Sequence, residues 1–274
     1  MQEIQIDYSG CSQSPVVEEN STTGFADIPS DRISKTFQSG DFTGARPAQW
    51  GHYVFTAPYP DNDIYRGVRI PNTTVCRLQF DIEHQLDAPV YMYYRMTNFY
   101  QNHRRYVKSY DQGQLDGDAK SYGSIQGTDC APLDVDEETR KPYYPCGLIA
   151  NSLFNDTFFS PILLNAQDGD NSTTFEMTNQ GIAWSSDGDL YHQTKYRPDE
   201  VVPPPNWRRR FPEYTEANPP PNIGEWEEFW VWMRTAGLPT FSKMALRQDD
   251  IAMKPGRYQM DIWDGECTST THAV

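Results

Sequence analysis

The sequence predicts a mainly β protein, and three runs of alternating residues carry this prediction. Residues 76–82, 90–96 and 256–263 each place apolar side chains at every second position, which is the period of a strand with two different faces. Shorter runs rich in β-branched and aromatic residues repeat the pattern more weakly. In a chain of 274 residues these runs favour one large β domain over two smaller ones.

The first sixty residues are expected to hold two strands separated by a long loop. Ile4 and Ile6 alternate with polar residues and predict a strand that leads to Cys11. Polar and small residues dominate positions 12–46, so we expect a long excursion outside the core. Aromatic and β-branched residues return at positions 50–60, which predicts a second strand.

Residues 76–111 contain the two clearest strands and a dense mixture of polar and aromatic side chains. The strand at 76–82 is expected to be half-buried, and the break at 86–89 is short enough for an antiparallel hairpin to a central strand at 90–96. After Thr97 the alternation stops, and residues 98–106 mix rings, amides and cations. They predict a turn or short helix whose side chains tie loops down by hydrogen bonds. The alternative is a contact surface.

The middle of the chain alternates loops with weaker strands. Residues 131–145 predict a charged, turn-rich loop, and residues 161–165 and 173–177 predict two strands joined by a turn. Trp184 is expected to fill the core rather than to serve as a ligand platform. Residues 196–224 hold two runs of three prolines and predict an extended, polyproline-like surface arm.

Two structures are possible for residues 225–237. Asn222 with Glu225 would form a capping box and Gly237 a C-terminal cap, which together favour a helix. Residues 229–232 are rich in strand formers, and the neighbouring segments are predicted to be β. We therefore favour a strand here.

The charge balance disfavours polyanionic partners. The chain carries 23 Lys and Arg against 38 Asp and Glu, a formal net charge of −15. Its mean field repels nucleic acid and anionic lipid headgroups, so no nucleic-acid partner is predicted. The basic clusters Arg104–Arg105 and 208–210 are expected to pair locally with the acidic excess.

Sequons and cysteines favour an oxidising, glycosylating compartment. The sequence contains N-x-Ser/Thr sequons at Asn20, Asn72, Asn155 and Asn171, together with five cysteines. Neither a signal peptide nor an apolar run of about 20 residues is present, so we expect a soluble part of a longer membrane protein. Five cysteines allow two bridges in fifteen ways, and their spacing does not choose among these.

No motif for catalysis or metal binding stands out. The five histidines form no HxxxH or HExxH pair, and no cysteine pair has zinc-finger spacing. A G-x-S-x-G elbow and a phosphate-binding P-loop are also absent from the sequence. We expect no metal, cofactor or catalytic residue. A sandwich-fold hydrolase stays possible, because its two carboxylates would come from distant strands.

Several longer motifs carry a resemblance to a known family. They resemble the cell division control protein 50 family, also called the ligand-effect modulator family, which comprises non-catalytic subunits of phospholipid flippases. The similarity extends from residue 4 to about residue 263. The motifs are IDYSGC (6–11), TNFYQNHRRYVKS (97–109), QLDGD (114–118), CGLIANSLFNDTF (146–158), GIAWSSD (181–187) and VWMRTAGLPTFSKM (231–244).

The resemblance implies a fold and a function. The fold would be an antiparallel β-sandwich, jelly-roll-like, with long loops and a few short helices. Residues 1–274 would form a single ectodomain between two membrane helices that are not in this chain. It would be the accessory and chaperone subunit of a P-type lipid-transporting ATPase in a 1:1 heterodimer. It would support exit of the ATPase from the endoplasmic reticulum, its stability and its transport cycle. A carbohydrate-binding β-sandwich module is the alternative function.

The resemblance also implies site residues and a location. It pairs Cys11 with Cys76 and Cys130 with Cys146, and leaves Cys267 in residues 264–274, where the sequence departs from the family pattern. The chain would carry N-linked glycans on the lumenal or extracellular side of the endoplasmic reticulum, Golgi, endosomal or plasma membrane. Partner-binding residues are expected in and after the 90–96 strand: Tyr93, Phe99, Tyr100, Arg104 and Arg105.

Overall fold

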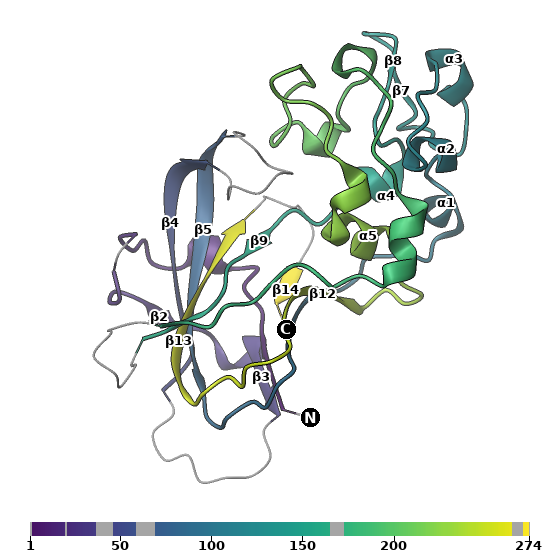
Figure 1. The fold of residues 1–274 in the computed structure, drawn as a ribbon. Helices are drawn as coiled ribbons and strands as arrows, with labels where there is room; N and C mark the ends of the chain where they lie inside the picture. Colours follow the sequence, from purple (N-terminus) through teal and green to yellow (C-terminus); the bar gives the residue numbers. More distant parts are fainter. Residues whose placement is uncertain are drawn as a thin grey trace.

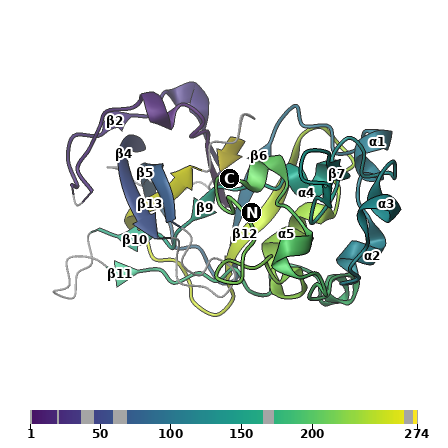
Figure 2. The same cartoon turned by 90° about the horizontal axis from the view of Figure 1, so that it is seen from above.

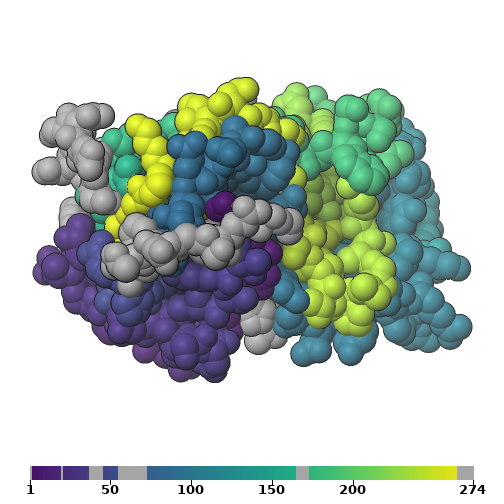
Figure 3. Space-filling view, turned by 90° about the horizontal axis from the view of Figure 1, so that it is seen from below, coloured from purple at the N-terminus to yellow at the C-terminus, as the bar shows by residue number. Residues whose placement is uncertain are grey.

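Two antiparallel sheets dominate the protein and pack face to face as a β-sandwich. The computed structural model describes residues 2–19, 21–36, 46–58, 69–164, 173–264 and 271–273. Strands β4, β5 and β13 lie on one side of the molecule, and helices α1 to α5 gather on the other (Figures 1 and 2). From below, purple N-terminal segments occupy one end and teal mid-chain segments the other (Figure 3). The mainly β fold predicted from the sequence is confirmed.

One sheet has the strand order β12-β6-β14-β1-β3, and the other has the order β11-β10-β13-β5-β4-β2, with β9 also paired to β13. Strands β7 and β8 form a small separate sheet. The strands are β1 (Glu3–Ile6), β2 (Ala26–Asp27), β3 (Ile33–Thr36), β4 (Gln49–Pro58), β5 (Arg69–Ile82), β6 (Val90–Met96), β7 (Val135–Asp136), β8 (Lys141–Pro142), β9 (Thr157–Phe158), β10 (Ile162–Leu163), β11 (Thr173–Thr174), β12 (Phe241–Gln248), β13 (Gly256–Asp264) and β14 (Thr271–Ala273).

The helices of the described residues are short. The 3-10 helices are η1 (Cys11–Gln13), η2 (Ser30–Arg32), η3 (Ser185–Leu190), η4 (Pro198–Glu200), η5 (Pro205–Trp207) and η6 (Ile223–Glu225). The α-helices are α1 (Arg104–Val107), α2 (Gln112–Leu115), α3 (Tyr122–Ile125), α4 (Leu148–Asn151) and α5 (Glu227–Met233).

The core between the two sheets is built from the predicted alternating runs. Apolar residues of β5 and β13 point inward and meet residues of β1 and β6 from the other sheet. Strands β5 and β13 are direct neighbours over nine residue pairs, which aligns their inward side chains in one register. The inward residues include Leu78, Phe80, Ile82, Tyr258, Met260 and Ile262, with Ile6 opposite them.

The polar face of β5 is also buried, so the prediction of a half-buried strand is wrong. Arg77 of β5 forms a salt bridge with Asp261 of β13 at 2.6 Å, and Asp81 pairs with Arg257 at 3.0 Å. The N-terminal excursion covers these pairs, since Arg77 also donates to the backbone oxygen of Glu19. Burial is tolerated here because each charge has an opposite partner and further hydrogen bonds.

The excursion therefore contributes more to the fold than the sequence predicted. It supplies β3, which pairs with β1, and β2, which pairs with β4, so each sheet gains an edge strand from residues expected to lie outside it. Val17 and Ile28 are buried. The predicted loop at 131–145 likewise contains the β7–β8 pair. Such two- to four-residue strands leave too little sequence pattern to be recognised.

Strands β5 and β6 do not form the predicted hairpin. β5 pairs with β4 and β13, whereas β6 pairs with β12 and β14 in the opposite sheet. The 86–89 segment instead carries the chain from one sheet to the other, and Leu86 bridges to Met253 on the way. The predicted central position of β6 is confirmed, because it has a strand on each side.

A second core lies under the helices and is mostly aromatic. Tyr94 of β6 stacks on Phe154 with ring centroids 3.9 Å apart, and Trp232 of α5 is fully buried beside them. Residues 225–237 were predicted to form a strand, and this prediction is wrong because residues 227–233 form α5. The helix is packed against both β12 and α4, which buries strand-forming residues on several of its faces.

The proline-rich segment also packs into this second core rather than forming a surface arm. Trp207 is buried and donates its indole N–H to the backbone oxygen of Ala150 at 2.8 Å. Tyr214 donates its hydroxyl to the backbone oxygen of Tyr144 at 2.9 Å. The prolines keep the backbone out of the sheets, as predicted, but the aromatic residues between them anchor the segment.

Candidate partner-binding surface

Strand β6 presents two different faces, as its alternation predicted. Tyr94 and Met96 are buried in the aromatic core. On the other face, Tyr91 is exposed and Tyr93 is half-buried, with their rings in an edge contact at 6.4 Å. The ring of Tyr93 thus contacts that of Tyr91, and both lie on the face of β6 that points away from the aromatic core.

The turn after β6 is held by amides, which supports the interpretation of residues 98–106 as a turn or short helix that ties loops down. Gln101 has no exposed surface, and its side-chain oxygen accepts a hydrogen bond from the backbone N–H of Ala236 at 2.8 Å. Asn102 donates to the backbone oxygen of Gly237 at 3.0 Å. The backbone N–H of Phe99 donates to the oxygen of Pro239 at 3.0 Å. Three bonds therefore fix the turn to the loop after α5.

Helix α1 begins directly after this turn. The side chain of His103 accepts a hydrogen bond from the backbone N–H of Arg105 at 3.3 Å and caps the helix. Tyr106 points inward, with its hydroxyl 2.8 Å from that of Ser152, and burial raises the pKa of Tyr106 to about 12. Arg104 and Arg105 point outward and are exposed.

The five predicted partner-binding residues do not all lie on one surface. Tyr100 is 58% exposed in the turn that leads into α1, where its backbone oxygen accepts a hydrogen bond from the N–H of His103 at 3.1 Å. Phe99 is half-buried and packs its ring against Trp232 and Phe241 in the aromatic core, with centroids 5.6 and 6.3 Å apart. Tyr93 lies on β6. Tyr100, Arg104 and Arg105 are therefore exposed on one turn and the helix that follows it, and their role stays a prediction.

Arg104 and Arg105 do not pair with the acidic excess as the charge balance suggested. In the part of the chain that the structure describes, neither guanidinium forms a salt bridge. By contrast, Arg208 pairs with Asp136 at 3.2 Å, as expected for the other basic cluster.

Trp184 is exposed, so the prediction that it fills the core is wrong. It is 66% exposed, and the guanidinium carbon of Arg234 lies 3.6 Å from its ring centroid. Arg234 also pairs with Asp187, which follows Trp184 in η3. A single tryptophan outside any alternating run gives no sign of whether it points inward or outward, so the sequence did not reveal that Trp184 is exposed or that Arg234 packs on it.

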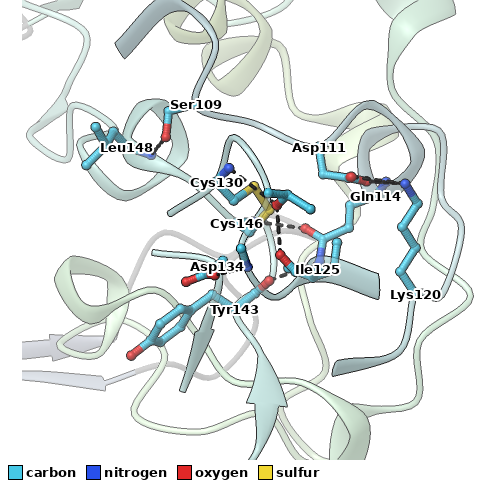
Figure 4. Close-up of a disulfide and its surroundings, with 12 residues drawn as sticks. Ser109, Asp111, Gln114, Lys120, Ile125, Cys130, Asp134, Tyr143, Cys146 and Leu148 are labelled. Atoms are coloured by element: carbon cyan, nitrogen blue, oxygen red, sulfur yellow. Dashed lines mark hydrogen bonds and ion pairs between the residues drawn. A yellow bond between two sulfur atoms is a disulfide. The ribbon is translucent and has the colours of Figure 1, made fainter. Parts of the chain in front are cut away.

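Two disulfides join the cysteine pairs that the resemblance implied. Cys11 and Cys76 are bridged with Cα atoms 5.8 Å apart, and Cys130 and Cys146 with Cα atoms 5.6 Å apart. Figure 4 shows the side chain of Gln114 beside the second bridge. It accepts from the backbone N–H of Cys146 at 2.9 Å and donates to the backbone oxygen of Tyr143 at 3.1 Å. Cys267 lies outside the described residues.

One sequon lies fully in the described structure. Asn155 is half-buried in the segment between α4 and β9, and its backbone oxygen accepts a hydrogen bond from Arg210 at 3.1 Å. Asn20 and Asn171 lie outside the described residues. Asn72 belongs to β5, but its side chain is also outside them.

Lys243 is a buried lysine with a structural role. Its ammonium donates to three backbone oxygens at the end of α5, at 2.6 to 2.8 Å, those of Val231, Trp232 and Arg234. Burial, together with the charge of Arg234, lowers its pKa to about 7. Lysines with a shifted pKa often mark reactive sites. The ammonium of Lys243 is instead bound to backbone oxygens at the end of α5, which is a structural role.

Among the residues that the structure describes, no three His, Cys, Asp or Glu side chains are grouped so that they could hold a metal ion. Within the same residues, none of the helices is both long enough and apolar enough to cross a membrane.

A family model matches residues 1–265, almost the whole chain, and describes the LEM3 (ligand-effect modulator 3) family, or CDC50 family. This chain belongs to the CDC50 family. Among curated proteins it is similar to the phospholipid-transporting ATPase accessory subunit CDC50 of Chaetomium thermophilum, with 39% identity over 96% of this chain and 62% of the relative. It is 35% identical to the accessory subunit LEM3 of Saccharomyces cerevisiae, over 95% of this chain and 59% of the relative.

Mammalian relatives match a smaller part. Cell cycle control protein 50A of Bos taurus is 39% identical over 70% of this chain and 55% of its own length. The CDC50-family chain described here thus spans about six tenths of the length of the fungal relatives.

Proposed function

We propose that this chain is the ectodomain of a non-catalytic accessory subunit of a phospholipid-transporting P-type ATPase. In this proposal the ATPase hydrolyses ATP and moves the lipid, and this chain contributes binding energy and stability. The observation that carries the proposal is the family match over residues 1–265, together with relatives that are named as accessory subunits of such ATPases.

The proposal includes a location and an assembly. We infer that the chain lies on the lumenal or extracellular side of an endoplasmic reticulum, Golgi, endosomal or plasma membrane, with N-linked glycans and flanking membrane helices. Its two disulfides support an oxidising compartment. One copy would bind one ATPase, and this binding would be needed for exit of the ATPase from the endoplasmic reticulum.

Purification of the full-length protein in mild detergent tests this function. Each phospholipid-transporting ATPase of the source organism is co-expressed with it, and the expected result is that one of them co-purifies at 1:1. Without the accessory subunit, the same ATPase should stay in the endoplasmic reticulum. If none of the ATPases co-purifies with the full-length protein, the proposed function is wrong.

The exposed ring of Trp184 favours the carbohydrate-binding alternative, since exposed aromatic rings can stack on sugars. Arg234 already covers one face of this ring, with 3.6 Å between its guanidinium carbon and the ring centroid. Binding to a glycan array that is lost in Trp184→Ala would support that alternative.

A further inference from the structure

Three strongly exposed apolar side chains lie on segments that contact the end of α5 or the loop that follows it. Tyr100, Trp184 and Leu238 are 58%, 66% and 69% exposed, although they come from distant parts of the sequence. Exposed aromatic and aliphatic side chains gathered on adjoining loops commonly mark an interaction site. We call these three residues, with Arg234, the loop surface.

Specific contacts hold the loop surface together. Leu238 lies between Gly237 and Pro239, and the backbone oxygens of both accept hydrogen bonds from the Tyr100 turn at 3.0 Å. Arg234 leads into the same loop from the end of α5. Its guanidinium packs on the ring of Trp184 and pairs with Asp187. The loop surface is thus held in one arrangement before any partner arrives, which lowers the entropy cost of binding.

The turn next to the loop surface is positively charged in an acidic chain. Residues 98–110 contain Arg104, Arg105 and Lys108 but no Asp or Glu, whereas the whole chain has a net charge of −15. All three cations are exposed, and none has a carboxylate partner among the described residues. Cations that the chain's own carboxylates leave unpaired are suited to carboxylates of another molecule.

We propose that the loop surface and the adjacent cations dock a protein segment of the ATPase that carries apolar side chains flanked by carboxylates. This inference rests on the proposed function and adds the surface and the chemistry of the partner. Tyrosine, tryptophan and arginine are the residue types that most often dominate binding energy at protein interfaces. The apolar anchors supply affinity, and Arg104, Arg105 and Lys108 speed association and set its salt dependence.

The test uses full-length protein and the ATPase that it captures. Leu238→Asp and Tyr100→Asp are each compared with Ile251→Asp, a matched change at a residue that is 58% exposed in the connection between β12 and β13. We expect each loop-surface variant to capture at least about tenfold less ATPase, because a charge replaces an anchor. Ile251→Asp should capture the wild-type amount. All variants should keep the wild-type melting temperature, since the altered side chains are exposed.

A second measurement isolates the charges. The double variant Arg104→Glu/Arg105→Glu should associate with the ATPase more slowly than wild type at low salt. The association rate of wild type should fall as the salt concentration rises, and that of the double variant should not. Lys195→Glu is the control, because Lys195 already pairs with Asp118.

The outcomes separate the two proposals. If wild type captures no ATPase, the proposed function is wrong. If wild type captures an ATPase, and the folded variants Leu238→Asp and Tyr100→Asp capture as much, the accessory function stands and the loop-surface inference is overturned. If the double arginine variant associates at the wild-type rate at every salt concentration, the assignment of an acidic partner segment is overturned.

Discussion

Lys243 shows how one buried charge can determine where a helix ends. Its N–H donors meet the backbone oxygens of Val231 and Trp232 in the last turn of α5, which have no partner within the helix, and that of Arg234 directly after it. In Lys243→Met the side-chain volume is kept but these oxygens lose their donors, so we expect the free energy of unfolding to fall by about 3 kcal/mol. Chemical denaturation measures it. Lys254→Met is the control at an exposed position, and an equal loss there would contradict the explanation.

Lys243 also predicts a dependence of stability on pH. Its pKa is lowered to about 7 in the folded protein and is about 10.4 in an unfolded chain. Between these values the unfolded state binds more protons, so the free energy of unfolding should rise with pH, by up to about 1.4 kcal/mol per unit. The rise should appear in the difference between the free energies of unfolding of wild type and Lys243→Met, because the contributions of all other titrating groups cancel in that difference. A flat difference between pH 7.5 and 9.5 would contradict it.

Trp184 marks the limit of single-residue reasoning from sequence. The sequence predicted the turn after β6 and its amide contacts, because that segment concentrates donors and acceptors. Whether a lone tryptophan is buried depends on what packs against it, and Arg234 and Asp187 fix that position through contacts formed only in the folded chain. The loop surface could therefore be recognised only from the three-dimensional structure.

Strands β5, β6 and β13 were predicted from the sequence, whereas helix α5 was not. The three strands were predicted because one face of each meets the core and the other is polar. Helix α5 lacks such a contrast, since Phe229, Val231 and Trp232 are all buried. Its local sequence favours a strand, and burial against β12 and α4 outweighs that preference. The sheet assignment of β5 and β6 also needed long-range pairing that a short connection does not reveal.

Helix α4 begins at a glycine that has no room for a side chain. Gly147 has a φ of 100°, and a Cβ placed on it would lie 2.1 Å from the backbone oxygen of Ser109. Gly147→Ala must displace this backbone, so we expect a loss of more than about 3 kcal/mol or failure to fold. Gly237→Ala meets nothing within 4 Å and should change stability by less than about 0.5 kcal/mol. Melting temperatures of the two variants, if equal, would contradict this prediction.

The two disulfides stabilise different halves of the molecule. Cys11–Cys76 closes 65 residues in the β-sandwich, and Cys130–Cys146 closes 16 residues beside α3 and α4. Restricting the unfolded chain should contribute about 4 kcal/mol for the first bridge and about 3 kcal/mol for the second. Double Cys→Ser variants of each pair, unfolded in denaturant, measure this. Limited proteolysis should cut first in the half that lost its bridge, and cleavage in the other half would contradict the assignment.

The pairing of the first and last described strands has a mechanical consequence. β14 lies between β1 and β6, with Ala273 opposite Ile6, and Figures 1 and 2 mark both ends of the chain close together. Because β1 and β14 are antiparallel, chain that precedes β1 and chain that extends β14 leave toward the same side. A pull on both ends would draw the two strands in one direction, so they would not slide past each other. The load would instead pass as shear into β3 and β6, and through β6 into the aromatic core that carries the loops.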